Sequence, residues 1–137
     1  MEKKFTRSFD EIKEIVAFAG RVFDDYGIDP SLRYIVDLAV EELFVNMVTY
    51  NTESTQDILL EMHAIDHGIE VSLTDFDVER FDPTKVPEVD VDAPLEERSV
   101  GGLGLYLVLK MVDSIHYEYR ERKSKITFRK RVENSGA

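Results

Sequence analysis

Apolar residues recur every three or four positions in two stretches of the N-terminal half. Ser8 and Glu11 stand at the spacing of a capping box and predict a helix start, and Gly27 is a natural terminator. Between them lies one apolar stripe: Ile12, Ile15, Val16, Ala19, Val22 and Phe23. A second and more apolar helix is predicted from the cap pair Asp29-Pro30 to about Tyr50.

The hydrophobic period changes from about 3.6 to 2 after Asp57, which indicates strands. A break at Asp66-His67-Gly68 predicts a tight turn between two antiparallel strands, and the C-terminal alternation predicts another hairpin. The expected strands are 4–7, 58–64, 69–73, 114–120 and 125–131.

Residues 76–100 show little periodicity and hold three of the four prolines, so they predict a long, lid-like loop. Gly101-Gly102-Leu103-Gly104 then leads into an apolar helix over 105–112. This order of elements predicts a single domain, 1–137. Its class is α+β, a two-layer sandwich with helices on one face of a mixed, largely antiparallel sheet.

Composition narrows the class of function. The chain has 137 residues, is 43% hydrophobic and carries a formal net charge of −11. Direct binding to nucleic acid is not expected, because it needs clustered cations that displace counterions from phosphates. Cysteine is absent, which excludes disulfides and thiol chemistry. No stretch approaches the length of a membrane span or a signal core, so we expect a cytoplasmic protein without membrane contact.

Two polar residues stand out in the second helix. At 100° per residue, Glu42 and Asn46, together with Thr49, fall among its apolar positions and opposite the polar Arg33 and Asp37. A buried carboxylate and amide must be hydrogen-bonded or must line a cavity. From helix geometry alone, a binding site and a purely structural pairing to backbone groups or at a dimer contact are equally consistent with the pattern.

Other candidate features are less specific. The glycines before the helix at 105–112 permit phosphate binding at a helix start, but a flexible hinge fits the same pattern. His63, His67 and His116 have no metal-ligand spacing and are assigned no role. The acidic run 88–97 is interpreted as a solvated loop rather than a docking surface.

Three blocks of the sequence resemble the GHKL, or histidine-kinase-like, ATPase family, and most closely its anti-sigma-factor serine/threonine kinase branch. Together they span about residues 5–132. The blocks are Glu42-Leu43-Phe44-Val45-Asn46, Thr74-Asp75-Phe76-Asp77 with Phe81-Asp82-Pro83, and Pro94-Leu95-Glu96-Glu97-Arg98 with Gly101-Gly102-Leu103-Gly104-Leu105-Tyr106-Leu107-Val108.

The resemblance implies a role for each matching residue. Glu42 would be the general base, Asn46 a Mg²⁺ ligand and Asp75 the acceptor for the adenine amino group of ATP. The backbone of Gly102, Gly104 and Leu105 would cradle phosphate. The implied partners are an anti-sigma-factor antagonist, which the kinase phosphorylates, and a sigma factor, which it sequesters. A homodimer is implied as well.

One position departs from the family pattern. Asp77 stands where the second block usually has glycine, two residues after Asp75, and the spacing to 81–83 is one residue longer. If the Asp77 carboxylate pointed into the adenine pocket, it would oppose nucleotide entry. The alternative function is therefore a partner-binding switch module with weak or no ATP turnover on the same fold.

Overall fold

The computed structural model describes residues 1–79 and 108–132. Within them, one five-stranded sheet has the order β1-β2-β3-β5-β4, and all four neighbouring pairs are antiparallel. The elements are β1 Glu2–Phe5, the 3₁₀ turn η1 Phe9–Glu11, α1 Ile12–Tyr26, the 3₁₀ turn η2 Pro30–Leu32, α2 Arg33–Tyr50, β2 Ile58–Ile65, β3 Gly68–Phe76, β4 Ser114–Arg120 and β5 Lys123–Arg131.

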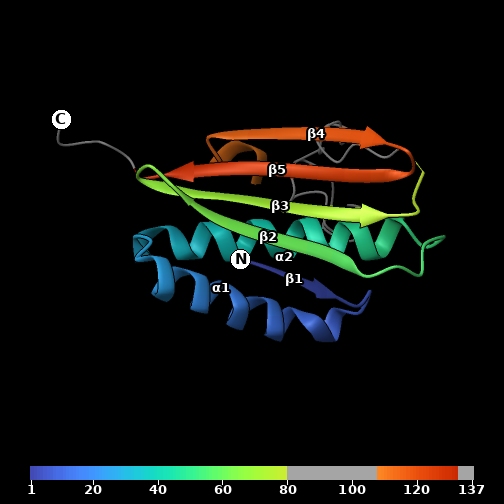
Figure 1. The fold of residues 1–137 in the computed structure, drawn as a ribbon, viewed down its shortest axis with the longest axis horizontal. Coiled ribbons are helices and arrows are strands. Elements are labelled where there is room, and N and C mark those ends of the chain that lie inside the picture. Colours follow the sequence, from blue (N-terminus) through green and yellow to red (C-terminus); the bar gives the residue numbers. More distant parts are fainter. Residues whose placement is uncertain (80–107, 133–137) are drawn as a thin grey trace, which may run out of the picture.

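The helices and the sheet form two layers (Figure 1). Helix α1 packs against β2 and helix α2 against β3, so both helices cover the same face of the sheet. The predicted α+β sandwich is confirmed. The prediction of a mixed sheet is corrected, because every strand pair in the described residues is antiparallel.

The ends of α1 follow the predicted local signals with one change. Ser8 accepts a hydrogen bond from the Asp10 amide as the N-cap of η1, the turn that leads into α1, and Gly27 ends α1 with a left-handed φ of 62°. Glu11 does not close the capping box on Ser8. Its carboxylate accepts instead from the amide of Thr6 over 3.1 Å, so Glu11 holds the chain two residues before the cap residue Ser8.

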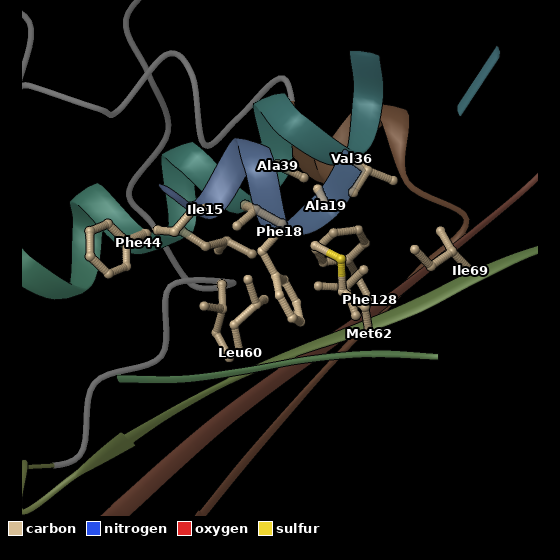
Figure 2. Close-up of a cluster of buried hydrophobic side chains, with 14 of the residues drawn as sticks. Ile15, Phe18, Ala19, Val36, Ala39, Phe44, Leu60, Met62, Ile69 and Phe128 are labelled. Atoms are coloured by element: carbon tan, nitrogen blue, oxygen red, sulfur yellow. The ribbon is translucent and has the colours of Figure 1, made fainter. Parts of the chain in front are cut away.

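The core lies between the two layers (Figure 2). Alternate residues of the strands point toward the helices and are buried, while the outward face carries polar contacts such as that between the hydroxyls of Ser72 and Thr127 at 2.8 Å. The side chains that Figure 2 labels come from both layers: Ile15, Phe18, Ala19, Val36, Ala39, Phe44, Leu60, Met62, Ile69 and Phe128. This packing explains the apolar stripes of the helices.

Both hairpins turn through two residues. The β2–β3 turn is Asp66 and His67, with φ of 61° at His67, and the β4–β5 turn is Glu121 and Arg122, with φ of 53° and 60°. Left-handed φ values match the twist of neighbouring strands in short hairpins. Gly68 is required for a different reason, because a Cβ there would lie 2.1 Å from the backbone oxygen of Lys130.

Several boundaries differ from the sequence prediction. The first strand begins two residues before the expected 4–7 segment, at Glu2, and β5 begins at Lys123. Thr49 is exposed, so its predicted place on the inward face of α2 is wrong. Residues 108–111 of the predicted 105–112 helix are helical, Val112 is not, and 105–107 lie outside the described residues. None of the described helices combines the length and apolarity that a membrane span requires.

Candidate functional site

Glu42 and Asn46 lie one turn apart on α2 and share a side of the helix. Asn46 is 7% exposed, and its Nδ2 has no hydrogen-bond partner in the described structure. Buried amides are almost always bonded, so an orphaned one requires an explanation. Since the two ends of an asparagine amide are interchangeable by rotation, the group offers either a donor or an acceptor to a ligand at this place.

Glu42 is half-buried beside that amide. Burial raises the pKa of its carboxyl above the ordinary value, and the neighbouring charge of Glu41 raises the pKa further. A carboxylate with a raised pKa is a stronger base and accepts a proton more readily at neutral pH. The pair therefore combines a proton acceptor with an unpaired polar group one helical turn, about 5–6 Å, away.

Asp75 lies near the end of β3 on the face that the helices cover. It continues the inward series of Ile69, Val71 and Leu73, and its side chain is 0% exposed. Burying a carboxylate is costly unless it is paired and hydrogen-bonded. Its partners therefore decide what this group can do.

Two residues hold the Asp75 carboxylate. The Asn51 side-chain amide donates to Oδ2 over 2.6 Å, and the Arg7 guanidinium donates to Oδ1 through Nη2. Asn51 directly follows α2, and its own backbone amide donates to Met47. The end of α2 thus meets the end of β3, and Asn51, the residue that joins them, follows Asn46 by five positions in the chain.

Sequence reasoning missed Arg7 and Asn51. Arg7 ends the predicted strand 4–7 but follows β1 in the structure, and Asn51 follows the second helix. Neither place predicts contact with β3, and the two residues are separated from Asp75 by 68 and 24 positions. A usable signal did exist, because a carboxylate at an inward position of a strand requires donors from elsewhere. Only the tertiary structure identifies which donors they are.

Asp77 does not join this cluster. Its side chain is 58% exposed and pairs with Arg122 Nε over 2.9 Å, at the turn of the β4–β5 hairpin. The backbone φ of 56° is left-handed, which aspartate tolerates better than most residues. Asp77 therefore adopts the left-handed backbone conformation that glycine favours. Its carboxylate is directed to the hairpin rather than to Asp75.

The segment after β3 is tied to the same region. Val78 donates its amide to Arg122 and accepts a bond from the Tyr119 hydroxyl, while the Ser54 hydroxyl donates to the Phe76 carbonyl over 2.5 Å. The first residues of the predicted 76–100 loop are thus anchored on the sheet and on the α2–β2 connection.

Several predicted features lie outside the described residues. They are Gly102, Gly104 and Leu105 of the phosphate cradle, the segment 81–83 and the acidic run 88–97. The structure places Glu42 and Asn46 on one side of α2 and joins Asp75 to Asn51 at the end of that helix, while a single site formed by these residues and the glycine segment remains a prediction. In 1–79 and 108–132, no three histidine or acidic side chains are grouped as metal ligands would be.

The fold and the site define a class of protein: an α+β domain with a buried polar cluster between its longest helix and the end of a central strand. The sequence model described as "Histidine kinase-like ATPase domain" matches residues 5–130. The chain belongs to this family, a class of ATP-binding domains that includes kinases.

Structural comparison agrees with that assignment. The chain is similar to Acinetobacter baumannii histidine kinase AdeS, with a TM-score of 0.54 and 13% sequence identity. The alignment covers 98% of this chain and 68% of that chain. At this identity the likeness shows the fold alone. A comparison with curated protein sequences gives no match.

Proposed function

We propose that this chain is a Mg²⁺- and ATP-dependent serine/threonine protein kinase of the anti-sigma-factor type. The observation that carries the proposal is the orphaned, buried amide of Asn46 one turn from the half-buried Glu42. A protein retains an unsatisfied buried polar group most readily where a ligand satisfies it. Family membership supports ATP as that ligand.

Each described residue has a distinct part in the proposed site. Asn46 would turn its amide oxygen to Mg²⁺, an ion that prefers oxygen ligands. Glu42 would accept the proton of the attacking hydroxyl, and Asp75 would accept a hydrogen bond from the adenine amino group. Bound ATP supplies the phosphoryl group, and the protein contributes position and electrostatic stabilisation. Gly102, Gly104 and Leu105 would cradle phosphate, as the family resemblance implies.

Calorimetric titration with ATP tests the nucleotide site. Wild-type protein is expected to bind ATP more tightly with Mg²⁺ than without it. Asn46→Ala should remove most of that Mg²⁺ dependence, and Asp75→Asn should weaken binding with or without the metal. If ATP binds equally well with and without Mg²⁺, Asn46 is not a metal ligand. If folded wild-type protein does not bind millimolar ATP, the proposed function is wrong.

The partners form the second part of the proposal. The kinase would phosphorylate a serine or threonine of an anti-sigma-factor antagonist and bind a sigma factor as a homodimer in the cytoplasm. The test is mass spectrometry of purified candidate antagonists after incubation with the protein and Mg²⁺-ATP. Glu42→Ala should bind ATP but leave the antagonist unmodified. Phosphate transfer by that variant would remove Glu42 from its role as base.

The second candidate function is a partner-binding switch with little or no nucleotide turnover. One observation favours it: both oxygens of Asp75 already have protein donors, Arg7 and Asn51, and the side chain has no exposed area. A site permanently closed in this way would not accept adenine. The two candidates differ in the titration above, because the switch module would bind ATP weakly or not at all.

A further inference from the structure

Arg7 closes the end of the site at which Asp75 lies. It belongs to the connection between β1 and η1, and its guanidinium donates to acceptors from three places. Nε donates to the Gln56 carbonyl over 2.9 Å, Nη1 to the Asn51 carbonyl at 3.4 Å, and Nη2 to Asp75 Oδ1. The side chain is 12% exposed, so it forms the outer cover of a carboxylate that lies beneath it.

The Arg7 side chain therefore prevents a hydrogen-bond donor of a ligand from reaching Asp75. A carboxylate with no exposed area is out of reach of a water-sized probe, and therefore also of an amino nitrogen of similar size. Adenine can bond to Asp75 only after one of the two protein donors has left. Asn51 is anchored by its backbone at the end of α2, whereas Arg7 has a long flexible stem and already touches solvent.

The surroundings of Arg7 provide a place for the released side chain. A surface hollow of about 300 Å³ is lined by Lys4, Thr55, Gln56, Asp57 and Phe76, and Gln56 is also the acceptor for Arg7 Nε. Burial lowers the pKa of Arg7, while the charges of Glu53 and Asp57 raise it. These two carboxylates favour the cation outside the buried position as well, since both are exposed.

We propose that Arg7 sets the nucleotide affinity of the site, because its guanidinium holds the Asp75 oxygen that the adenine amino group requires and must leave before the base binds. This inference rests on the proposed function. Arginine and the adenine amino group are both N–H donors, so they compete for one acceptor. Nucleotide then binds only the fraction of molecules in which Arg7 is released, and the apparent affinity falls by that fraction.

The test compares ATP binding, with Mg²⁺, to the wild type, Arg7→Met and the control Arg129→Met. Arg129 also pairs with a carboxylate, Glu70, at 2.7 Å, but this pair is exposed and lies on the open face of the sheet. We expect Arg7→Met to bind ATP about tenfold or more tightly than the wild type, and Arg129→Met to bind like the wild type. Circular dichroism confirms that each variant is folded.

The outcomes separate the two proposals. If the wild type binds ATP and folded Arg7→Met binds it equally or more weakly, Arg7 positions Asp75 and does not compete with adenine. The kinase proposal then stands. If neither protein binds, both proposals are wrong. If only Arg7→Met binds, Arg7 keeps the wild-type site closed, which confirms the competition and rejects the kinase function for the wild type.

A measurement on the wild type covers the case in which Arg7→Met does not fold. Trypsin cleaves after arginine only when the segment is accessible, so cleavage of the Arg7–Ser8 bond reports release of the side chain. With saturating Mg²⁺-ATP, that cleavage should accelerate several-fold relative to cleavage after Arg21, which is exposed on α1. Unchanged or slower relative cleavage with ATP bound would overturn the inference.

Discussion

Asn51 and Asp75 join the end of helix α2 to the end of strand β3 through a 2.6 Å hydrogen bond in the buried interior. Asn46, five residues earlier in the chain, has the same side chain and is also buried, yet its Nδ2 has no partner among the described residues. The amide group thus holds a buried carboxylate at Asn51 and is available to a ligand at Asn46.

Replacement of each asparagine by leucine should change stability in opposite directions. Asn51→Leu leaves the Asp75 carboxylate with one donor fewer and should lower the free energy of unfolding by about 2–3 kcal/mol. Asn46→Leu removes an unsatisfied buried amide and should raise it by about 1 kcal/mol, with loss of Mg²⁺-dependent ATP binding. Urea unfolding checks both. A destabilised Asn46→Leu variant would mean that the amide is already bonded in the free protein.

Glu42→Gln should affect stability in a pH-dependent way. The pKa of Glu42 is raised in the folded protein, so the folded state binds its proton more tightly than the unfolded chain. Stability from this group is present below the ordinary glutamate pKa and is lost as pH rises through the folded value. At neutral pH the glutamine variant should therefore be more stable than the wild type.

The difference between Glu42→Gln and the wild type should vanish in acid. Urea unfolding between about pH 3 and pH 8, which spans the ordinary carboxyl pKa and neutrality, measures this difference. Glu14→Gln, at an exposed position of α1, is the control and should show no stabilisation at neutral pH. A constant difference at every pH would show that the charge of Glu42 is not its cause.

Gly68→Ala should be strongly destabilising because of a steric clash. The added Cβ would lie 2.1 Å from the Lys130 carbonyl oxygen, a backbone atom of the paired strand, and we expect a loss of about 3 kcal/mol. Gly27→Ala is the matched control: its φ is 62°, but nothing lies within 4 Å of the added atom, so only about 1–2 kcal/mol should be lost. Similar losses in the two variants in thermal or urea unfolding would contradict the steric argument.

Glu121→Asn should stabilise the β4–β5 hairpin. Glu121 has a φ of 53°, a left-handed conformation that asparagine adopts more easily, and two-residue hairpin turns favour it. The gain should be about 0.5–1 kcal/mol, measured as a higher midpoint of thermal unfolding. Glu118→Asn, in the regular part of β4, should give no gain. The other turn residue, Arg122, is left unchanged in this variant because it pairs with Asp77.

Local patterns in the sequence determined the fold class and most of its elements. The helix from Asp29-Pro30 to Tyr50 and the hairpin around Asp66 and His67 agree with the structure, because periodicity and turn residues act over short distances. The same patterns indicated that Glu42 and Asn46 share a helix face. The capping pair of Glu11 and the inward place of Thr49 were wrong, since contacts from outside the helix decide them.

The partners of the polar residues were decided only by the tertiary structure. Asp75 is held by Arg7 and Asn51, and Asp77 by Arg122. These contacts join positions 24 to 68 residues apart, and no periodic pattern encodes such a distance. A buried carboxylate requires donors, so the sequence determined that Asp75 must have partners. The packing of α2 on the sheet and the pairing of β1 with β2 determined which residues they are.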